Sequence, residues 1–361
     1  MIYDGAYSDW EKIGIKNNSI SVMGTSKTMG KSKKLIDRDE YYTLYDDISN
    51  ELPRYKEQFK GKRILCPCDW DESYDEEIIF RNKKEVRSND IFGGGSIKEI
   101  DIQATNNQIK KDINLIKCNF AKFLIAHAEA YGIESISVSG YNPITGKGVR
   151  FQDIDYSNYD LIVTNPPFSQ IEELFHILIK NKKEFLVIGP LSALGRQGLF
   201  NYFKENKMWL GYAKQLKGFM RPDGTLLLSK EKEGSIPRAC KWYTNLDVSY
   251  RHDFITLTES YYENPDRYPR ALNYDCIIVD GVKNIPMDYE GEMAVTANIM
   301  SKLNPDQFEI IGLSPFCAEK PDFDIPKEKR GGPQFYFMKN GELKRGFTSM
   351  VIKNKRPVKD E

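Results

Sequence analysis

The sequence predicts an α/β protein with a mostly parallel sheet, followed by a mixed, strand-rich region. Before about Gly211, short apolar runs alternate with longer segments of helical periodicity. This alternation is typical of parallel strands joined by right-handed crossovers. After Gly211, proline, glycine and aromatic residues become more frequent and helical periodicity weakens. The 361 residues are enough for a large domain or two packed ones.

Apolar runs and helical spacing give the expected elements of the first region. Strands are expected at residues 62–66, 135–139, 159–163 and 185–188. Helices are expected at residues 39–55, 118–131 and 170–181. Asp37 or Asp39 is the expected cap of the first helix, and Gly132 is expected to end the second.

Three further segments complete the expected organisation. Residues 1–34 are predicted to be a mobile basic arm, before a catalytic domain at residues 35–210. Residues 72–117 are predicted to be an insertion, in which 81–107 form a surface loop or a loop ordered on binding. In the region 211–361, a helix is expected near 292–303 and a strand at 334–337.

The charge balance constrains how this chain could bind nucleic acid. It has 52 basic and 52 acidic residues, so positive charge must be concentrated locally. Residues 27–38 and the segment from Lys320 onward are basic, the latter with eleven Lys/Arg against six Asp/Glu. Each run taken alone is more typical of a solvated surface. No apolar run of membrane-spanning length and no signal pattern is present, so we expect a cytoplasmic protein.

Cysteine and histidine spacing argues against a metal site. Cys66 and Cys68 are separated by one residue, and the other four cysteines and the three histidines are scattered. We expect reduced, mostly buried thiols and no bound metal.

The tetrapeptide Asn165-Pro166-Pro167-Phe168 directly follows the apolar run 159–163. Ligands of open parallel sheets bind beyond the carboxyl ends of strands. The Asn165 side-chain oxygen and the Pro166 carbonyl are two acceptors that could free the lone pair of adenine N6. Consecutive prolines keep the carbonyl rigid and add no donor. Phe168 offers a stacking face for an extruded base. A plain Asn-Pro turn is the simpler alternative.

These residues resemble motif IV of amino-methyltransferases with a Rossmann-like catalytic domain. Further segments between Lys33 and Gly312 resemble the EcoRI-type adenine-specific DNA methyltransferases. They include residues 39–43, 66–69, 118–120, 207–211, 242–247, 273–275 and 304–312. The resemblance implies a site-specific enzyme that transfers a methyl group from S-adenosylmethionine to adenine N6 in a flipped-out base of double-stranded DNA.

The resemblance also implies cofactor-binding roles for particular residues. Tyr42 and Thr43 would line the methionine end of S-adenosylmethionine, and Asp69, after Cys66, would hold its amino group. Asn119, Phe120 and Asn165 would lie along the cofactor, and Asp153 would face its adenine.

The chain departs from the family pattern at three places. Cys66-Pro67-Cys68-Asp69 replaces a glycine-rich first turn, no acidic residue ends the second strand, and the insertion at 72–117 has no assigned role.

The region 211–361 would then recognise the DNA target. Candidate contacts are Arg221, Arg238, Arg267, Arg270, Arg330 and Arg345. A cognate restriction endonuclease, or a phage or host modification system, is an implied partner. Related loops also serve RNA guanine and protein glutamine methylation, and a non-catalytic DNA-binding relative is a further alternative.

Overall fold

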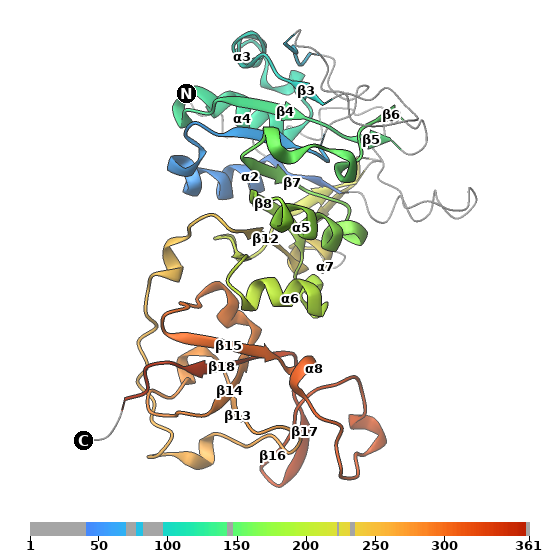
Figure 1. Cartoon of the computed structure of the whole chain (residues 1–361). Coiled ribbons are helices and arrows are strands. Elements are labelled where there is room, and N and C mark those ends of the chain that lie inside the picture. The colour runs from blue at the N-terminus through green and yellow to red at the C-terminus, as the bar shows by residue number, and fades with distance from the viewer. Residues whose placement is uncertain are drawn as a thin grey trace. The chain divides into compact units, whose positions relative to one another are not determined.

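The computed structural model describes residues 41–69, 77–81, 97–142, 147–221, 224–231 and 235–358. Its contacts divide the chain into two units (Figure 1). The first is Met1–Ala193 with Gly211–Leu246, and the second is Leu194–Leu210 with Asp247–Glu361. The expected arm at 1–34 and the basic run at 27–38 lie outside the described residues.

Gly211–Leu246, expected in the second region, groups with the first unit. The reason is that its strand β12 (Cys240–Thr244) pairs antiparallel with β8 (Glu184–Pro190).

The main sheet of the first unit is parallel at its centre, as expected. Its strands follow the order β3-β4-β2-β7-β8-β12, with β4, β2, β7 and β8 parallel and β3 and β12 antiparallel to their neighbours. The bounds not yet given are β2 (Arg63–Cys66), β3 (Lys98–Glu99), β4 (Ser135–Val138) and β7 (Leu161–Thr164). The chain leaves β2 toward β4 on one side and later reaches β7 on the other. The switch point, where such sheets bind ligands, therefore lies between β2 and β7.

Helices and short strands cover this sheet. Nine of the thirteen residues of helix α4 (Asn119–Tyr131) are buried, and the helix ends at Gly132, whose φ of 63° is the left-handed conformation expected there. Helix α5 (Ile171–Lys180) leads into β8. The other elements of this unit are α3 (Ile102–Ile109), α7 (Ser235–Ala239), β5 (Tyr141–Asn142), β6 (Lys147–Gly148) and β11 (Leu226–Leu228).

Two expectations for this unit are wrong in part. Residues 97–107 are not a loop, because β3 pairs with β4 and Asp101 caps α3 by accepting from the Ala104 amide. The helix expected at 39–55 begins only at Tyr45, as α2 (Tyr45–Glu51), and continues as the 3-10 helix Leu52–Phe59.

The late start of α2 has a tertiary cause. Tyr42 and Thr43 form β1, which pairs antiparallel with β10 (Gly218–Met220). Leu44, which is extended and has an apolar side chain that cannot cap, precedes the helix, and the expected caps lie outside the described residues.

The second unit is built on a four-stranded sheet in the order β13-β14-β18-β15. Only β13 and β14 are parallel to one another. The strands are β13 (Ile277–Val279), β14 (Glu292–Thr296), β15 (Phe308–Leu313) and β18 (Ser349–Asn354). Helices α6 (Gln197–Lys204) and α8 (Ser314–Cys317) pack on β15, and β9 (Trp209–Leu210) also belongs to this unit.

The helix expected near 292–303 is wrong. Residues 292–296 are β14, followed by the 3-10 helix Ala297–Ser301, because pairing with β13 and β18 overrides a weak helical pattern. The strand expected at 334–337 is present as β16 (Tyr336–Lys339), which forms a hairpin with β17 (Glu342–Arg345). Asn340 and Gly341 both have positive φ, as a two-residue hairpin turn requires.

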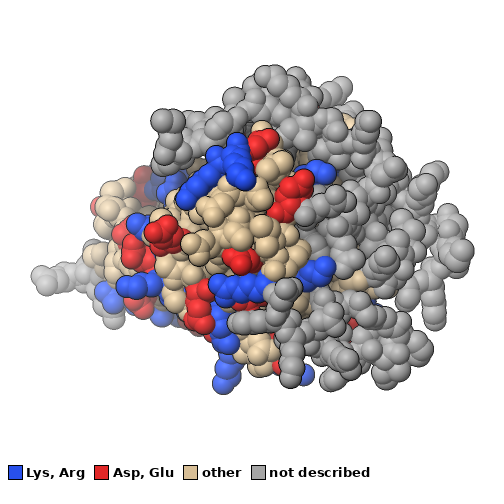
Figure 2. Space-filling model, turned by 90° about the horizontal axis from the view of Figure 1, so that it is seen from above, with Lys and Arg blue, Asp and Glu red and all other residues tan. Residues whose placement is uncertain are grey.

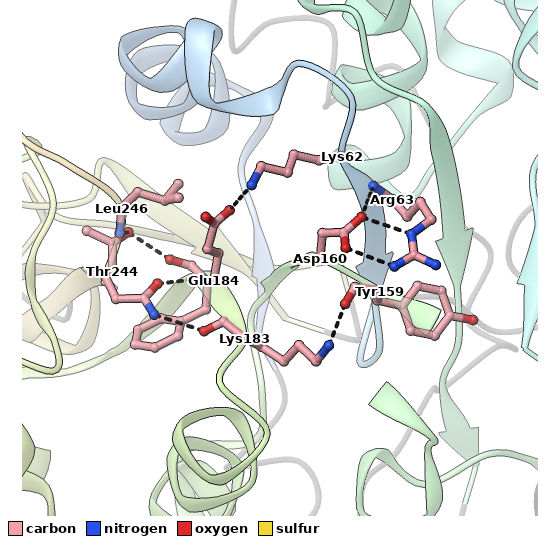
Figure 3. A network of polar contacts seen from close by, with 10 residues as sticks. Lys62, Arg63, Tyr159, Asp160, Lys183, Glu184, Thr244 and Leu246 are labelled. Atoms are coloured by element: carbon pink, nitrogen blue, oxygen red, sulfur yellow. Dashed lines mark hydrogen bonds and ion pairs between the residues drawn. The ribbon is translucent and has the colours of Figure 1, made fainter. Parts of the chain in front are cut away.

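Polar contacts connect neighbouring strands to one another at the amino-terminal edge of the main sheet (Figure 3). Arg63, which begins β2, donates Nε and Nη2 to the two carboxylate oxygens of Asp160, each at 2.9 Å, and its amide donates to the same group. The guanidinium lowers the pKa of Asp160 to about 2. Lys183 donates to the Tyr159 carbonyl at 2.8 Å, and Lys62 pairs with Glu184. This edge is opposite to the carboxyl ends of β2 and β7.

In the described ranges, no helix is long and apolar enough to cross a membrane. All six cysteines are free thiols and five of them are buried, as expected.

Candidate active site

The Asn165-Pro166-Pro167-Phe168 loop follows β7 at the switch point, where the sequence predicts it. The first three residues of the loop are buried and Phe168 is half-buried. The Pro167 carbonyl accepts from the Gln170 amide at 3.0 Å and starts the 3-10 helix Phe168–Gln170. This short helix fixes the direction in which the loop leaves the strand.

Asp69 lies after β2 and ties the two strand ends together. Its carboxylate accepts the Thr164 hydroxyl at 2.6 Å and the Asn165 amide at 3.3 Å. These partners are more than ninety positions away in the sequence. The contact therefore arises from the adjacency of β2 and β7 in the sheet.

Burial raises the pKa of Asp69 to about 7, although hydrogen bonds from Thr164, Asn165 and Cys68 act in the opposite direction. Asp69 as a whole is half-buried. A half-buried carboxylate with donors but no cation is suited to a positively charged ligand, which would favour its ionised form.

Thr43 and Asn119 form a second part of the site. The Asn119 side chain, at the start of α4, donates Nδ2 to the Thr43 carbonyl at 2.8 Å. This bond joins α4 to β1 across 76 positions of sequence. Both side chains are buried.

Several buried polar atoms here have no hydrogen-bond partner among the described residues. They are Thr43 Oγ1, Asn119 Oδ1 and Asn165 Oδ1. Unpaired buried polar atoms are costly, and at a functional site they are typically completed by a ligand. Three such atoms, with the Asp69 carboxylate, fit a ligand that carries an ammonium group and further donors.

The Asn165 side chain is held in one orientation. Its Nδ2 donates to the Tyr41 carbonyl at 2.5 Å, which leaves Oδ1 open. Within the described residues, the Pro166 carbonyl also accepts no hydrogen bond. The loop therefore presents two open acceptors next to one another.

An aromatic cluster surrounds the end of this loop. Tyr41 stacks on Phe168, with ring centroids 5.6 Å apart and an interplanar angle of 27°. Phe219 meets Phe168 edge-on at 6.1 Å and lies 5.5 Å from Tyr41. Phe219 is in β10, so the pairing of β1 with β10 assembles the cluster.

Four other predicted residues lie in different environments. Cys66 ends β2 and is fully buried, which raises the pKa of its thiol. Tyr42 is the β1 partner of Met220. Phe120 is buried and packs edge-on against Trp242. Asp153 pairs with Arg150 at 2.7 Å. No contact between Asp153 and the Asp69–Asn165 cluster is seen, although its neighbour Gln152 donates to Gln170, just after the loop.

Sequence reasoning missed Tyr41, Thr164 and Phe219. The position of Thr164, directly before Asn165, was a usable signal. Tyr41 adjoins the predicted Tyr42, but the carbonyl contact with Asn165 has no sequence signature. Phe219 had none, because its place depends on strand pairing between distant segments.

On the face in Figure 2, Lys and Arg side chains are interspersed with Asp and Glu, without a patch of one sign. Ion pairs also engage two of the candidate arginines, since Arg270 pairs with Asp275 and Arg267 with Glu259. Arg238 donates to two backbone carbonyls. A DNA-binding surface therefore has to come from a local group of cations.

An open, centrally parallel sheet with an Asn-Pro-Pro-Phe loop at its switch point defines the class of methyltransferases with a Rossmann-like catalytic domain. A sequence model of the family "Adenine-specific methyltransferase EcoRI" matches residues 29–355. The chain belongs to this family, and it is a site-specific DNA adenine methyltransferase.

Named relatives agree with this assignment. The chain is 33% identical over 327 residues to type II methyltransferase M.EcoRI of Escherichia coli, covering 82% of this chain and 92% of that protein. It is 28% identical to type II methyltransferase M.MgeORF184P of Mycoplasma genitalium, over 88% and 96% of the two chains. It is 26% identical to type II methyltransferase M.MpnI of Mycoplasma pneumoniae, over 89% and 96%. No solved structure matches the chain significantly.

Proposed function

We propose that the first unit binds S-adenosylmethionine and methylates N6 of an adenine extruded from double-stranded DNA, while the second unit selects the sequence. The observation that carries this proposal is the pair of open acceptors at the strand end, Asn165 Oδ1 and the Pro166 carbonyl. They stand next to an aromatic ring, Phe168.

The two acceptors act on the nucleophile. The lone pair of adenine N6 is delocalised into the ring, so the amine attacks poorly. Two acceptors that receive hydrogen bonds from the two N–H groups of the amine favour a pyramidal nitrogen with an available lone pair. The Tyr41 carbonyl holds the Asn165 amide, so its oxygen does not have to reorganise during the reaction.

The aromatic cluster receives the base. An adenine that leaves the duplex loses its stacking, and Phe168 with Tyr41 and Phe219 replaces that contact. The loop and the cluster then hold the amine next to the methyl donor, and this positioning lowers the barrier to attack.

S-adenosylmethionine supplies an electrophilic methyl group on a sulfonium. We propose that Asp69 holds its ammonium group and that Thr43 and Asn119 bind the methionine end through their unpaired atoms. Tyr42, Cys66, Phe120 and Asn165 would border this end, and Asp153 would face the adenine.

The type II names of the relatives place those proteins in restriction–modification. We propose that this enzyme likewise protects DNA sites that a cognate restriction endonuclease, or a phage or host system, recognises.

Asn165→Ala tests the catalytic role. Methyl transfer should fall about a hundredfold or more, while S-adenosylhomocysteine still binds, because Asp69, Thr43 and Asn119 remain in place. Asn165→Asp keeps an acceptor oxygen but loses the N–H that donates to the Tyr41 carbonyl. Its rate of methyl transfer should therefore lie between those of the wild type and Asn165→Ala. The control is Asn181→Ala, which removes an exposed amide at the other end of α5. Wild-type turnover in Asn165→Ala would exclude this role.

The substrate is tested with S-adenosylmethionine carrying a labelled methyl group, offered with DNA, RNA and protein. We expect label in DNA alone, recovered as N6-methyladenine. Label in RNA or protein, or in none of the three, would contradict the proposal.

A further inference from the structure

Phe347 is the most exposed large apolar side chain of the described residues, with 92% of its surface accessible. It follows the β16–β17 hairpin of the second unit, two positions after Arg345. Leaving a phenylalanine exposed forgoes the stabilisation that burial would give. A single exposed apolar residue is common on protein surfaces, so the Phe347 ring has to be considered together with the charged side chains around it.

The backbone around Phe347 is held in place on both sides. Before it, the Gly346 amide donates to Phe335, the residue that precedes β16, and after it the Ser349 amide donates to the first residue of α8. The contacts are Gly346 N to Phe335 O at 2.8 Å, Gln334 Nε2 to Thr348 Oγ1 at 3.0 Å, and Ser349 N to Ser314 Oγ at 2.9 Å. The ring is therefore presented to solvent from an ordered loop, and binding would cost little backbone entropy.

Backbone carbonyls orient three cations of the β16–β17 hairpin and of the segment that precedes it. Lys329 donates to Leu343 at 2.5 Å, Arg330 to Ile325 at 3.0 Å, and Arg345 to Gly332 at 2.9 Å. Among the described residues, none of the three forms an ion pair with a carboxylate. A carbonyl partner fixes the side chain without neutralising its charge.

The local charge is positive in a chain that is neutral as a whole. Residues 327–347 contain six Lys/Arg and two Asp/Glu, and the neighbouring residues 320–326 add one Lys and two Asp. Lys339 and Lys344 of this segment pair with Asp280 and Glu342, and Arg267 and Arg270 are likewise paired with carboxylates. Lys329, Arg330 and Arg345 have backbone carbonyls as partners and keep further donors for an anion.

We propose that Lys329, Arg330, Arg345 and Phe347, here called the Phe347 patch, bind duplex DNA. The three cations contact phosphates, and the Phe347 ring packs against bases that it unstacks. Basic side chains around an apolar wedge are a recurrent way of gripping and bending DNA. This inference rests on the proposed DNA substrate and assigns to the patch a contact with it.

Phe347→Ala is the first test, with Tyr262→Ala as its control. Tyr262 is also exposed in the second unit, at 61%, but its neighbours Glu259, Glu263 and Asp266 are acidic. Binding to a fluorescent duplex oligonucleotide should weaken by about fivefold to a hundredfold in Phe347→Ala, as loss of base–aromatic stacking predicts. Tyr262→Ala should bind as the wild type does.

The cations are tested through salt dependence. Arg330→Gln should flatten the plot of log Kd against log salt by about 0.9, the value for one phosphate contact, whereas Phe347→Ala should leave the slope unchanged. S-adenosylhomocysteine affinity should be that of the wild type in every variant, which shows that the fold is intact.

The outcomes separate this inference from the proposed function. If the wild type methylates DNA while Phe347→Ala binds the duplex normally and Arg330→Gln retains the full salt slope, the Phe347 patch does not contact DNA. If the wild type methylates no DNA at all, the proposed function itself fails.

Discussion

Replacing Asp69 with asparagine separates charge from shape at the end of β2. The amide keeps one oxygen for the Thr164 hydroxyl, but it removes the second oxygen, which accepts from the Asn165 backbone amide, and the negative charge offered to the ammonium group. A charge-assisted hydrogen bond contributes about 1.5 to 3 kcal/mol, so affinity for S-adenosylhomocysteine should fall about tenfold to a hundredfold. Asp69→Ala would leave neither the Thr164 hydroxyl nor the Asn165 backbone amide with an acceptor, so it should impair transfer as well as binding.

The pH dependence of binding has a defined sign. The free protein holds Asp69 with a pKa of about 7, and only the ionised form pairs with an ammonium group. Binding therefore lowers this pKa and releases a proton near neutral pH. Each pH unit below about 7 should weaken the wild-type affinity by about tenfold, and the Asp69→Asn profile should be flat over that range.

Stability should respond in the opposite direction. The folded-state pKa of Asp69 is raised, so its contribution to stability is complete below the unfolded pKa of about 4 and is lost as pH rises through about 7. Without cofactor, Asp69→Asn should therefore melt at a higher temperature than the wild type above neutral pH.

Calorimetry across pH, in buffers of different ionisation enthalpy, measures both affinity and the protons released. Asp112→Asn, which alters an exposed carboxylate at a 3-10 helix cap, is the control and should match the wild type. Equal affinities and equal pH profiles for wild type and Asp69→Asn would refute the assignment of Asp69 to the ammonium group.

Two further variants test the aromatic cluster and the opposite edge of the sheet. Phe168→Ala removes the ring that contacts Tyr41 and Phe219, and it should weaken retention of a flipped base by about 1 to 3 kcal/mol. The defect, followed by 2-aminopurine fluorescence, should shrink at a mispaired target, and identical signals for mutant and wild type would limit Phe168 to packing. Asp160→Asn breaks the partly exposed pair with Arg63 and should cost about 1 kcal/mol of stability, with kcat unchanged. The contribution of Asp160 to stability is present above an unfolded pKa of about 4 and is lost as pH falls through about 2. The melting temperatures of wild type and Asp160→Asn should therefore converge in acid. A large loss of kcat in Asp160→Asn would contradict this purely structural role.

The central sheet was predictable because its strands are local apolar runs. β2, β4, β7 and β8 lie within about two residues of the expected positions, a usual error for element ends. Because β2 and β7 are parallel neighbours in the sheet, their carboxyl ends lie side by side. For this reason the Asp69–Asn165 contact follows from the sequence, although the two residues are far apart along the chain.

The remaining features depend on pairing that the local pattern does not encode. The residues of β1 continue a helical periodicity, and only β10 makes them a strand. That pairing brings Tyr41 and Phe219 to the loop. In β14 the same conflict appears, since Met293–Val295 lie between two neighbouring strands that determine their conformation.

The placement of α6 in the chain has a consequence during synthesis. Phe200 packs against Phe316, and Lys204 donates to the Ile311 carbonyl, so the partners of α6 lie in β15 and α8. At about 5 to 20 residues per second, a ribosome needs on the order of ten seconds to make the segment between them. During that interval β12, the last strand of the first unit, is already made, whereas β15 and α8, which contact α6, are not. A nascent chain stalled in this window should be captured by chaperones that bind apolar helices.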